Sequence, residues 1–162
     1  MQGKARVVTF EQRPEFATLR AAFPAGAVDG VAVGASVSVN GTCLTVTQQP
    51  SANELCFDLI KETLRATSLG GLKAGDAFNF ERSARFGDEV GGHNVSGHVH
   101  TTATVLHVED TPDNRSMFFS VPSPQFMKYI FPKACGSCLR RPHHMGLLLA
   151  TRRASSRWMG AA

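Results

Sequence analysis

The sequence lacks any apolar run long enough to span a bilayer, and its first residues lack the apolar core of a secretory signal. Charged residues make up 19% and hydrophobic residues 43% of its 162 residues, which is typical of a soluble globular protein. A chain of this length can bury a hydrophobic core of one domain with or without an extension. These features predict a soluble, cytoplasmic protein.

Acidic residues are absent from residues 133–162, where six basic residues lie: Lys133, Arg140, Arg141, Arg152, Arg153 and Arg157. The whole chain has 17 basic and 13 acidic residues, so residues 1–132 keep 11 basic residues against all 13 acidic ones. The sequence pI of about 9.1 therefore reflects the tail, and the body is slightly acidic. This distribution argues against a barrel that binds nucleic acid.

Cysteine is scarce, and its arrangement does not support a metal centre. Cys43 and Cys56 occur singly in strand-like stretches, which is typical of reduced thiols in a cytosolic protein. Residues 135–138 form a Cys-x-x-Cys that two histidines follow, but a second Cys-x-x-Cys is absent. We therefore expect no metal site.

Short alternating runs separated by turn residues dominate the chain. They predict strands at residues 4–10, 16–23, 36–39, 42–47, 55–60, 77–81, 99–108 and 116–121, with turns at 11–14 and 48–53. Asn40-Gly41 between two such runs favours a type I′ hairpin turn. A short helical turn is expected at 61–67, and Ser123-Pro124 indicates the start of another helix. Residues 1–132 are therefore predicted to form one small antiparallel barrel, and residues 133–162 a disordered or partly helical tail.

The alternation after Gly41 sorts side chains between two faces of a strand. Leu44 and Val46 are expected to face a core, whereas Cys43, Thr45 and Thr47 face the other way. A thiol and two hydroxyls on one face can line a polar pocket. The alternative is that they lie on the solvated outer face of a sheet.

Residues 91–100 concentrate glycine and histidine. Four of the six histidines lie in or just after this stretch, and His93 and His98 are five residues apart beside flexible backbone. Histidines in such a setting suit acid/base chemistry. The alternative is a Gly-Gly turn that leads into a strand with exposed histidines. The spacing is not the helical spacing of a zinc site.

Three runs in the order and spacing of one known family stand out: residues 36–47 (SVSVNGTCLTVT), 57–70 (FDLIKETLRATSLG) and 91–98 (GGHNVSGH). With Met127-Lys128-Tyr129-Ile130 and Lys133, they resemble the N-terminal lumazine-binding domain of riboflavin synthase, alpha chain. The resemblance covers residues 2–133. It implies an all-β fold, a small six-stranded antiparallel Greek-key barrel with one or two short helices.

The resemblance also implies an activity. That family converts two molecules of 6,7-dimethyl-8-ribityllumazine into riboflavin and a diaminouracil product, by transfer of a four-carbon unit between them. No cofactor is implied, because the substrate ring is itself the electron sink and the enzyme positions two rings and moves protons. The alternative is a non-catalytic flavin or lumazine carrier of the lumazine-protein type.

The resemblance assigns roles to individual residues. Catalytic roles fall on Ser36, Cys43, His93 and His98. Ligand-binding roles fall on Cys43, Leu44, Thr45, Asp58, Ile60, Lys61, Glu62, Thr63, Gly97, His98, Val99 and Lys133.

Two departures from the family pattern shape the expectation. Family members begin with Met-Phe-Thr-Gly-Ile-Val before the Gln-Gly found here as Gln2-Gly3. They also carry a second barrel, whose motifs do not recur in residues 133–162; we interpret this tail as a hinge followed by non-family basic sequence, with the second domain missing or out of frame. We expect a homo-oligomer, a trimer as in the intact family or a dimer, that binds lumazine or riboflavin and has little activity.

Overall fold

The computed structural model describes residues 2–89, 96–113, 115–129, 138–140, 145–147 and 158–160. The chain divides into two compact units, Met1–His98 and Val99–Ala162, which we describe separately. The predicted domain boundary at residue 132 stays a prediction. None of the helices in these described ranges is long and apolar enough to cross a membrane.

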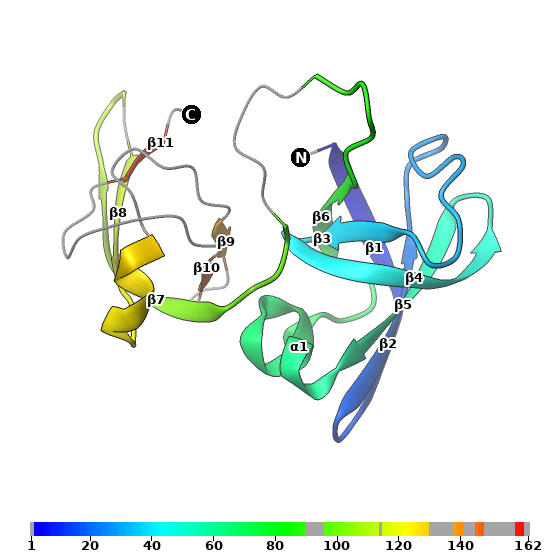
Figure 1. Cartoon of the computed structure of the whole chain (residues 1–162), viewed down its shortest axis with the longest axis horizontal. Coiled ribbons are helices and arrows are strands. Elements are labelled where there is room, and N and C mark those ends of the chain that lie inside the picture. The colour runs from blue at the N-terminus through cyan, green and yellow to red at the C-terminus, as the bar shows by residue number, and fades with distance from the viewer. Residues whose placement is uncertain are drawn as a thin grey trace. The chain divides into compact units, whose positions relative to one another are not determined.

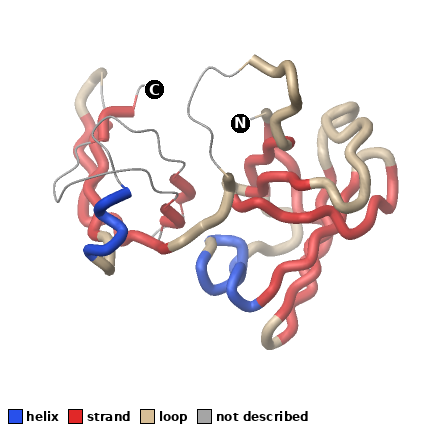
Figure 2. The backbone as a smooth tube through the Cα atoms, viewed as in Figure 1, coloured by secondary structure: helices blue, strands red, loops and turns tan. Residues whose placement is uncertain are grey.

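The first unit is a closed antiparallel barrel of six strands in the order β1-β2-β5-β4-β3-β6 (Figures 1 and 2). Its elements are β1 Gly3–Arg13, β2 Phe16–Ala22, β3 Ser36–Val39, β4 Thr42–Ser51, β5 Glu54–Ile60, helix α1 Lys61–Ala66, the 3₁₀ helix η1 Ser68–Gly71 and β6 Ala77–Arg82. The predicted six-stranded Greek-key barrel with few helices is therefore confirmed. The predicted short helix after β5 is also present.

The β3–β4 hairpin turns at Asn40 and Gly41, as the sequence predicts. Both residues have positive φ, 49° and 79°, which is the conformation that a type I′ turn requires. The Asn40 side chain also accepts a hydrogen bond from the Asn79 amide at 2.8 Å, and the Asn40 amide donates to the Asn79 carbonyl at 2.7 Å. The hairpin end is thereby tied to β6.

Two turns, predicted at 11–14 and 48–53, are shorter than predicted because strand pairing extends into them, and they occupy residues 14–15 and 52–53. β1 continues to Arg13, which pairs with Phe16 across a two-residue loop of Pro14 and Glu15. β4 continues to Ser51 and pairs with β5, although Pro50 lies within it. The β4–β5 register shifts between Val46 and Ser51, and such irregularity lets a strand accommodate proline.

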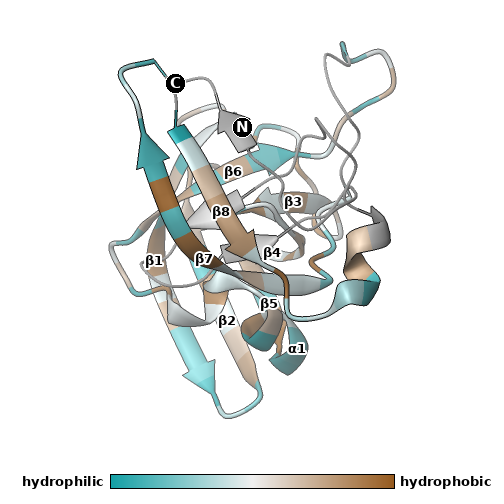
Figure 3. Ribbon diagram, turned by 90° about the vertical axis from the view of Figure 1, so that its left-hand side faces the viewer, coloured by the Kyte–Doolittle hydropathy of each residue, from teal (hydrophilic) through white to brown (hydrophobic). Residues whose placement is uncertain are grey.

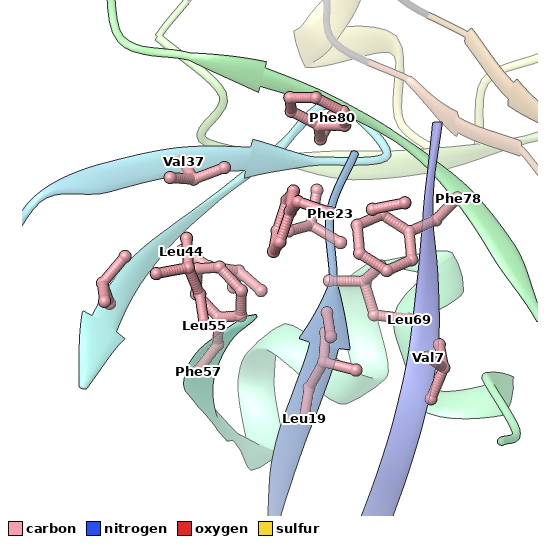
Figure 4. Close-up of a cluster of buried hydrophobic side chains, with 14 of the residues drawn as sticks. Val7, Leu19, Phe23, Val37, Leu44, Leu55, Phe57, Leu69, Phe78 and Phe80 are labelled. Carbon is pink, nitrogen blue, oxygen red and sulfur yellow. The ribbon is translucent and has the colours of Figure 1, made fainter. Parts of the chain in front are cut away.

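The barrel interior is filled by aliphatic and aromatic side chains from all six strands, from the β2–β3 connection and from the β5–β6 connection (Figure 4). Phe23, just after β2, lies at the centre of an aromatic group. Its ring packs edge-on against Phe80 at a centroid distance of 5.0 Å and against Phe78 at 6.1 Å. Such edge-to-face contacts add to the free energy gained from burying the rings.

The second unit contains a five-stranded sheet in the order β11-β8-β7-β10-β9. Its elements are β7 Thr101–Asp110, β8 Arg115–Ser120, the 3₁₀ helix η2 Pro124–Tyr129, β9 Cys138–Arg140, β10 Met145–Leu147 and β11 Trp158–Gly160. The helix predicted after Ser123 is thus a 3₁₀ helix, and the Phe126 amide donates to the Ser123 carbonyl at 3.2 Å.

The β7–β8 hairpin repeats the pairing of the β1–β2 hairpin position by position. Val7 pairs with Ala21, and Val105 pairs with Phe119; each residue of the second pair stands 98 positions after its counterpart. The register shift also recurs at the same place, after Val7 in β1 and after Val105 in β7. The two hairpins therefore share one geometry, including a β-bulge.

The two hairpins differ in how far their apolar side chains are covered. Ala5 and its counterpart Ala103 are equally buried, each 2% exposed. Leu106 and Val108, in contrast, are 62% and 44% exposed. Figure 3 shows hydrophobic and hydrophilic segments alternating along β7. Their counterparts in β1, Val8 and Phe10, are half-buried. The second hairpin thus exposes more apolar surface than the first.

Candidate functional site

The outer surface of the β3–β4 hairpin carries four small polar side chains, Ser36, Ser38, Cys43 and Thr45, which we call the polar face. Ser36 pairs directly with Thr45, and Ser38 with Cys43. Residues opposite each other in such a pair have Cβ atoms about 5 Å apart. The polar face is therefore a compact patch of three hydroxyls and one thiol.

The sorting of side chains in β4 agrees with the alternation read from the sequence. Leu44 and Val46 are buried in the barrel core, Thr45 is exposed, and Cys43 and Thr47 are half-buried on the opposite face. Because the Leu44 side chain lies in the core, only its backbone can meet a ligand at the surface. Ser38 was not among the predicted residues, although its place two residues after Ser36 is the signal that could have found it.

The edge of β4 beside the polar face is contacted by the chain near Gly97. Toward the start of β4, the pairing of β4 with β5 ends at Val46 and Phe57. Beyond it, the Cys43 amide donates a hydrogen bond to the Gly97 carbonyl at 2.9 Å. A contact between backbones 54 positions apart thus takes the place of the β4–β5 ladder at this point.

Gly97 is buried and fits this contact only as glycine. Its φ is +74°, a conformation that L-residues with side chains rarely adopt. A Cβ atom at this position would lie 2.9 Å from both the backbone nitrogen and the Cβ of Cys43. Both the backbone conformation and the available space therefore require glycine here.

His98 follows this contact directly. Its amide donates to the Ser96 hydroxyl at 3.3 Å, and its side chain is exposed. The Gly97–Cys43 hydrogen bond therefore holds the His98 backbone next to the polar face. Val99 is the first residue of the second unit. His93 and Lys133, also predicted site residues, lie outside the described residues.

The end of β5 contributes one polar and one apolar side chain to the surface. Asp58 is exposed and accepts a hydrogen bond from the Thr18 hydroxyl at 3.1 Å. Ile60, the last residue of β5, is 61% exposed.

Helix α1 begins directly after Ile60, and its predicted ligand residues already have partners within the chain. Lys61 forms an ion pair with Glu15. The Glu62 carboxylate accepts hydrogen bonds from the Arg65 guanidinium at 2.5 and 2.9 Å, which lower the pKa of Glu62. The Thr63 carbonyl accepts from the Thr67 amide at 3.1 Å. The two ion pairs are exposed, so their exchange with a ligand costs little.

The segment after β6 is also tied to the polar face. The Ser83 hydroxyl donates to the Ser36 carbonyl at 2.9 Å. Ser83 was not predicted, and no local pattern marks it, because the bond joins residues 47 positions apart.

The two thiols of the barrel differ in environment. Cys56 on β5 is buried, and desolvation raises the pKa of its thiol. Cys43 is half-buried on the polar face. In the part of the chain that the structure describes, no group of three His, Cys, Asp or Glu residues is placed to hold a metal ion.

The hydroxyls and the thiol of the polar face can donate hydrogen bonds to a polar ligand or accept them from it.

Comparison with known proteins agrees with this chemistry. Residues 1–83 match the family model of the lumazine binding domain. The riboflavin synthase of Escherichia coli (strain K12) is 48% identical over 133 residues, which cover 82% of this chain and 62% of that protein. The riboflavin synthase of Buchnera aphidicola subsp. Baizongia pistaciae is 43% identical over 106 residues, 65% of this chain and 50% of that protein. The chain thus spans less than two thirds of the length of these relatives.

Two solved structures share the fold. LumP complexed with riboflavin aligns with a TM-score of 0.69 and 17% identity, over 99% of this chain and 96% of that one. LumP complexed with 6,7-dimethyl-8-(1'-D-ribityl) lumazine gives 0.68 and 18%, over 93% and 83%. The resemblance to riboflavin synthase that the sequence motifs indicate is confirmed by the curated relatives. The chain belongs to the lumazine binding domain family.

Proposed function

We propose that this chain binds 6,7-dimethyl-8-ribityllumazine and riboflavin on the polar face and acts as the lumazine-binding part of a riboflavin synthase. The observation that carries the proposal is the 48% identity to a riboflavin synthase over 133 residues. The glycine-specific contact of Gly97 with Cys43 supports it, because this contact joins two of the motifs on which the resemblance rests.

The ring of the ligand lies against Cys43 and Thr45 in this proposal, and its polar rim meets their side chains and the Leu44 backbone. The stretch from Asp58 to Thr63 borders the ring, with Ile60 as its apolar contact. Gly97, Val99 and Lys133 are assigned to the ligand by resemblance to the family.

Proton transfer is assigned to histidine in this proposal. His98 handles protons beside the ring, and His93, Ser36 and Cys43 complete the catalytic group by resemblance. An imidazole suits this role because it has one nitrogen that can donate a proton and one that can accept it.

The reaction consumes two molecules of 6,7-dimethyl-8-ribityllumazine. One loses a four-carbon unit and becomes the diaminouracil product, and the other gains that unit and becomes riboflavin. Two rings must therefore lie side by side, and orienting them is most of the catalytic task. We assign the second ring to the polar face of another copy, which makes the active form a homo-oligomer.

A titration of the whole chain with riboflavin, followed by flavin fluorescence, tests binding. We expect a saturable change at micromolar ligand, and the absence of any change at high micromolar ligand contradicts the proposal. Incubation with 6,7-dimethyl-8-ribityllumazine, with chromatographic detection of riboflavin, then tests catalysis.

A pair of histidine variants separates a role at the site from a general effect. His98→Ala is expected to weaken binding or turnover while the melting temperature stays unchanged. His107→Ala, which removes a histidine of the second unit that stacks on Phe118 and pairs with Glu109, serves as the control and is expected to leave binding and turnover unchanged. Equal effects of the two variants contradict the role assigned to His98.

A non-catalytic flavin or lumazine carrier is the second candidate function. The fold shared with LumP, whose solved structures hold riboflavin and the ribityllumazine ligand, favours it. Binding without any formation of riboflavin from 6,7-dimethyl-8-ribityllumazine would favour the carrier over an active enzyme.

A further inference from the structure

The corner between helix α1 and the 3₁₀ helix η1 is held by the hydroxyl of Thr67. This hydroxyl donates a hydrogen bond to the Thr63 carbonyl at 2.6 Å and accepts one from the Leu69 amide at 3.2 Å. The Thr67 amide donates to the same Thr63 carbonyl at 3.1 Å. One residue thus joins the last turn of α1 to the start of η1.

The η1 side of this corner is fixed to the barrel. Leu69 is 0% exposed and lies among the side chains that fill the barrel (Figure 4). Its carbonyl accepts a hydrogen bond from the Leu72 amide at 3.0 Å. Gly70 packs so closely against α1 that a Cβ atom at this position would lie 2.9 Å from the Leu64 carbonyl oxygen. η1 is therefore an anchored support against which the end of α1 rests.

Helix α1 itself is weakly held. It has six residues, none of which is buried, and a helix this short is not stable on its own. The ion pair of Glu62 with Arg65 lies within the helix, and the ion pair of Lys61 with Glu15 is exposed, so neither fixes the helix strongly. Leu64 packs partly against the barrel core. The direction of α1 therefore depends on this packing and on the hydroxyl at the corner.

We infer that Thr67 is a positioning residue, whose hydroxyl sets the orientation in which α1 presents Glu62 and Thr63 to the ligand ring. This inference rests on the proposed function, which places residues 58–63 along the border of the ring. The hydroxyl proton already goes to the Thr63 carbonyl, so Thr67 acts on the ligand through α1. When a binding orientation is populated only part of the time, the apparent affinity falls by that fraction.

Variants of Thr67 in the full chain test the inference through riboflavin affinity. Thr67→Val keeps the branched shape but loses both hydrogen bonds of the hydroxyl, so binding is expected to weaken about tenfold. Thr67→Ser keeps a hydroxyl that can form the same two bonds, so its affinity should stay within about twofold of the wild type. Thr9→Val, on an exposed position of β1, is the control for replacing a hydroxyl by a methyl and should bind like the wild type.

Amide chemical shifts in the riboflavin-saturated chain distinguish positioning from a general effect. Riboflavin should shift the Cys43 and Thr45 amides equally in the wild type and in Thr67→Val, because the polar face is unchanged. The shifts that riboflavin causes at Glu62 and Thr63 should shrink in Thr67→Val. A variant that only destabilises the barrel would not confine the change to α1 once the chain is folded and saturated.

Gly70→Ala perturbs the same corner and leaves the Thr67 side chain in place. The new Cβ atom would force η1 and α1 apart, because it would lie 2.9 Å from the Leu64 carbonyl oxygen. We expect weaker riboflavin binding, with reduced shifts confined to Glu62 and Thr63. Melting curves show which variants fold. If Thr67→Val does not fold, wild-type affinity in Gly70→Ala overturns the inference.

The outcomes separate this inference from the proposed function. If the wild type does not bind riboflavin, the proposed function fails and the inference with it. If the wild type and Thr67→Val bind equally, the inference alone is overturned. Equal weakening in Thr67→Val and Thr67→Ser also overturns it, because the hydroxyl is then not the cause. Shifts that shrink at Cys43 and Thr45 as much as at Glu62 would show that Thr67 supports the whole barrel, which again overturns the inference.

Discussion

Replacing Gly97 by alanine should detach the chain at residue 97 from β4. The left-handed backbone conformation at φ +74° costs an alanine about 1–2 kcal/mol relative to glycine. The new Cβ would lie 2.9 Å from the Cys43 nitrogen, so the hydrogen bond from that nitrogen must lengthen or break, at a further cost of about 1 kcal/mol. The anchored arrangement should therefore lose about 2–3 kcal/mol, which corresponds to a shift of about 30- to 150-fold.

Amide hydrogen exchange measures this shift without any ligand. The Cys43 amide, whose acceptor is Gly97, should exchange about 30- to 150-fold faster in Gly97→Ala, up to the rate of a free amide. The Val46 amide, which donates to the Ala35 carbonyl at 2.9 Å within the barrel, should keep its protection. The melting temperature should change little, because the barrel closes without residue 97.

Gly30→Ala is the matched control for the free-energy cost of placing alanine at a positive φ. Gly30 has a similar φ of +67°, but no atom lies within 4 Å of the position a Cβ would take. This variant should leave exchange at Cys43 unchanged. The reasoning is refuted if the Cys43 amide of Gly97→Ala exchanges within about threefold of the wild-type rate, or if Gly30→Ala accelerates it equally.

Three further variants test the barrel itself. Asn40→Ala loses both the tolerance for positive φ and the 2.8 Å bond to Asn79, and the free energy of unfolding from urea denaturation should fall by about 1–3 kcal/mol. Phe23→Ala should lower it by about 3–5 kcal/mol, because the cavity lies at the aromatic centre of the core; a loss below about 1 kcal/mol would contradict that placement. Burial raises the pKa of Cys56, so its contribution to stability is full below the ordinary thiol pKa and declines as the pH rises through the raised value. Alkaline denaturation compared with Cys56→Ala checks the sign, and peptide mapping should show Cys56 alkylated more slowly than Cys43.

Local sequence patterns predicted those features of the fold that depend on neighbouring residues alone. Asn40-Gly41 predicted the hairpin because few dipeptides tolerate two consecutive positive φ values. The alternation of Leu44 and Val46 with polar residues predicted which face of β4 is buried. Cys43 and Thr45 could therefore be placed together on the opposite face from the sequence.

Contacts between distant parts of the chain could not be predicted from local sequence patterns. Pro50 favours a turn locally, but pairing with β5 outweighs that preference and extends β4 to Ser51. The bonds from Ser83 to Ser36 and from Cys43 to Gly97 join positions about 50 residues apart and leave no periodic signal. The sequence indicated that the glycines of residues 91–100 allow positive φ or close backbone approach, but the contact of Gly97 with Cys43 became visible only in the fold.

The repeated hairpin bears on the origin of the β-bulge in the barrel. In β1 the bulge follows Val7 and could be ascribed to the curvature that closure of six strands imposes. The same bulge follows Val105 in β7, a strand of the five-stranded sheet, with different neighbours. The bend is thus encoded within the hairpin itself and does not depend on closure. We therefore expect an isolated β1–β2 hairpin to keep this bend in the absence of β5 and β6.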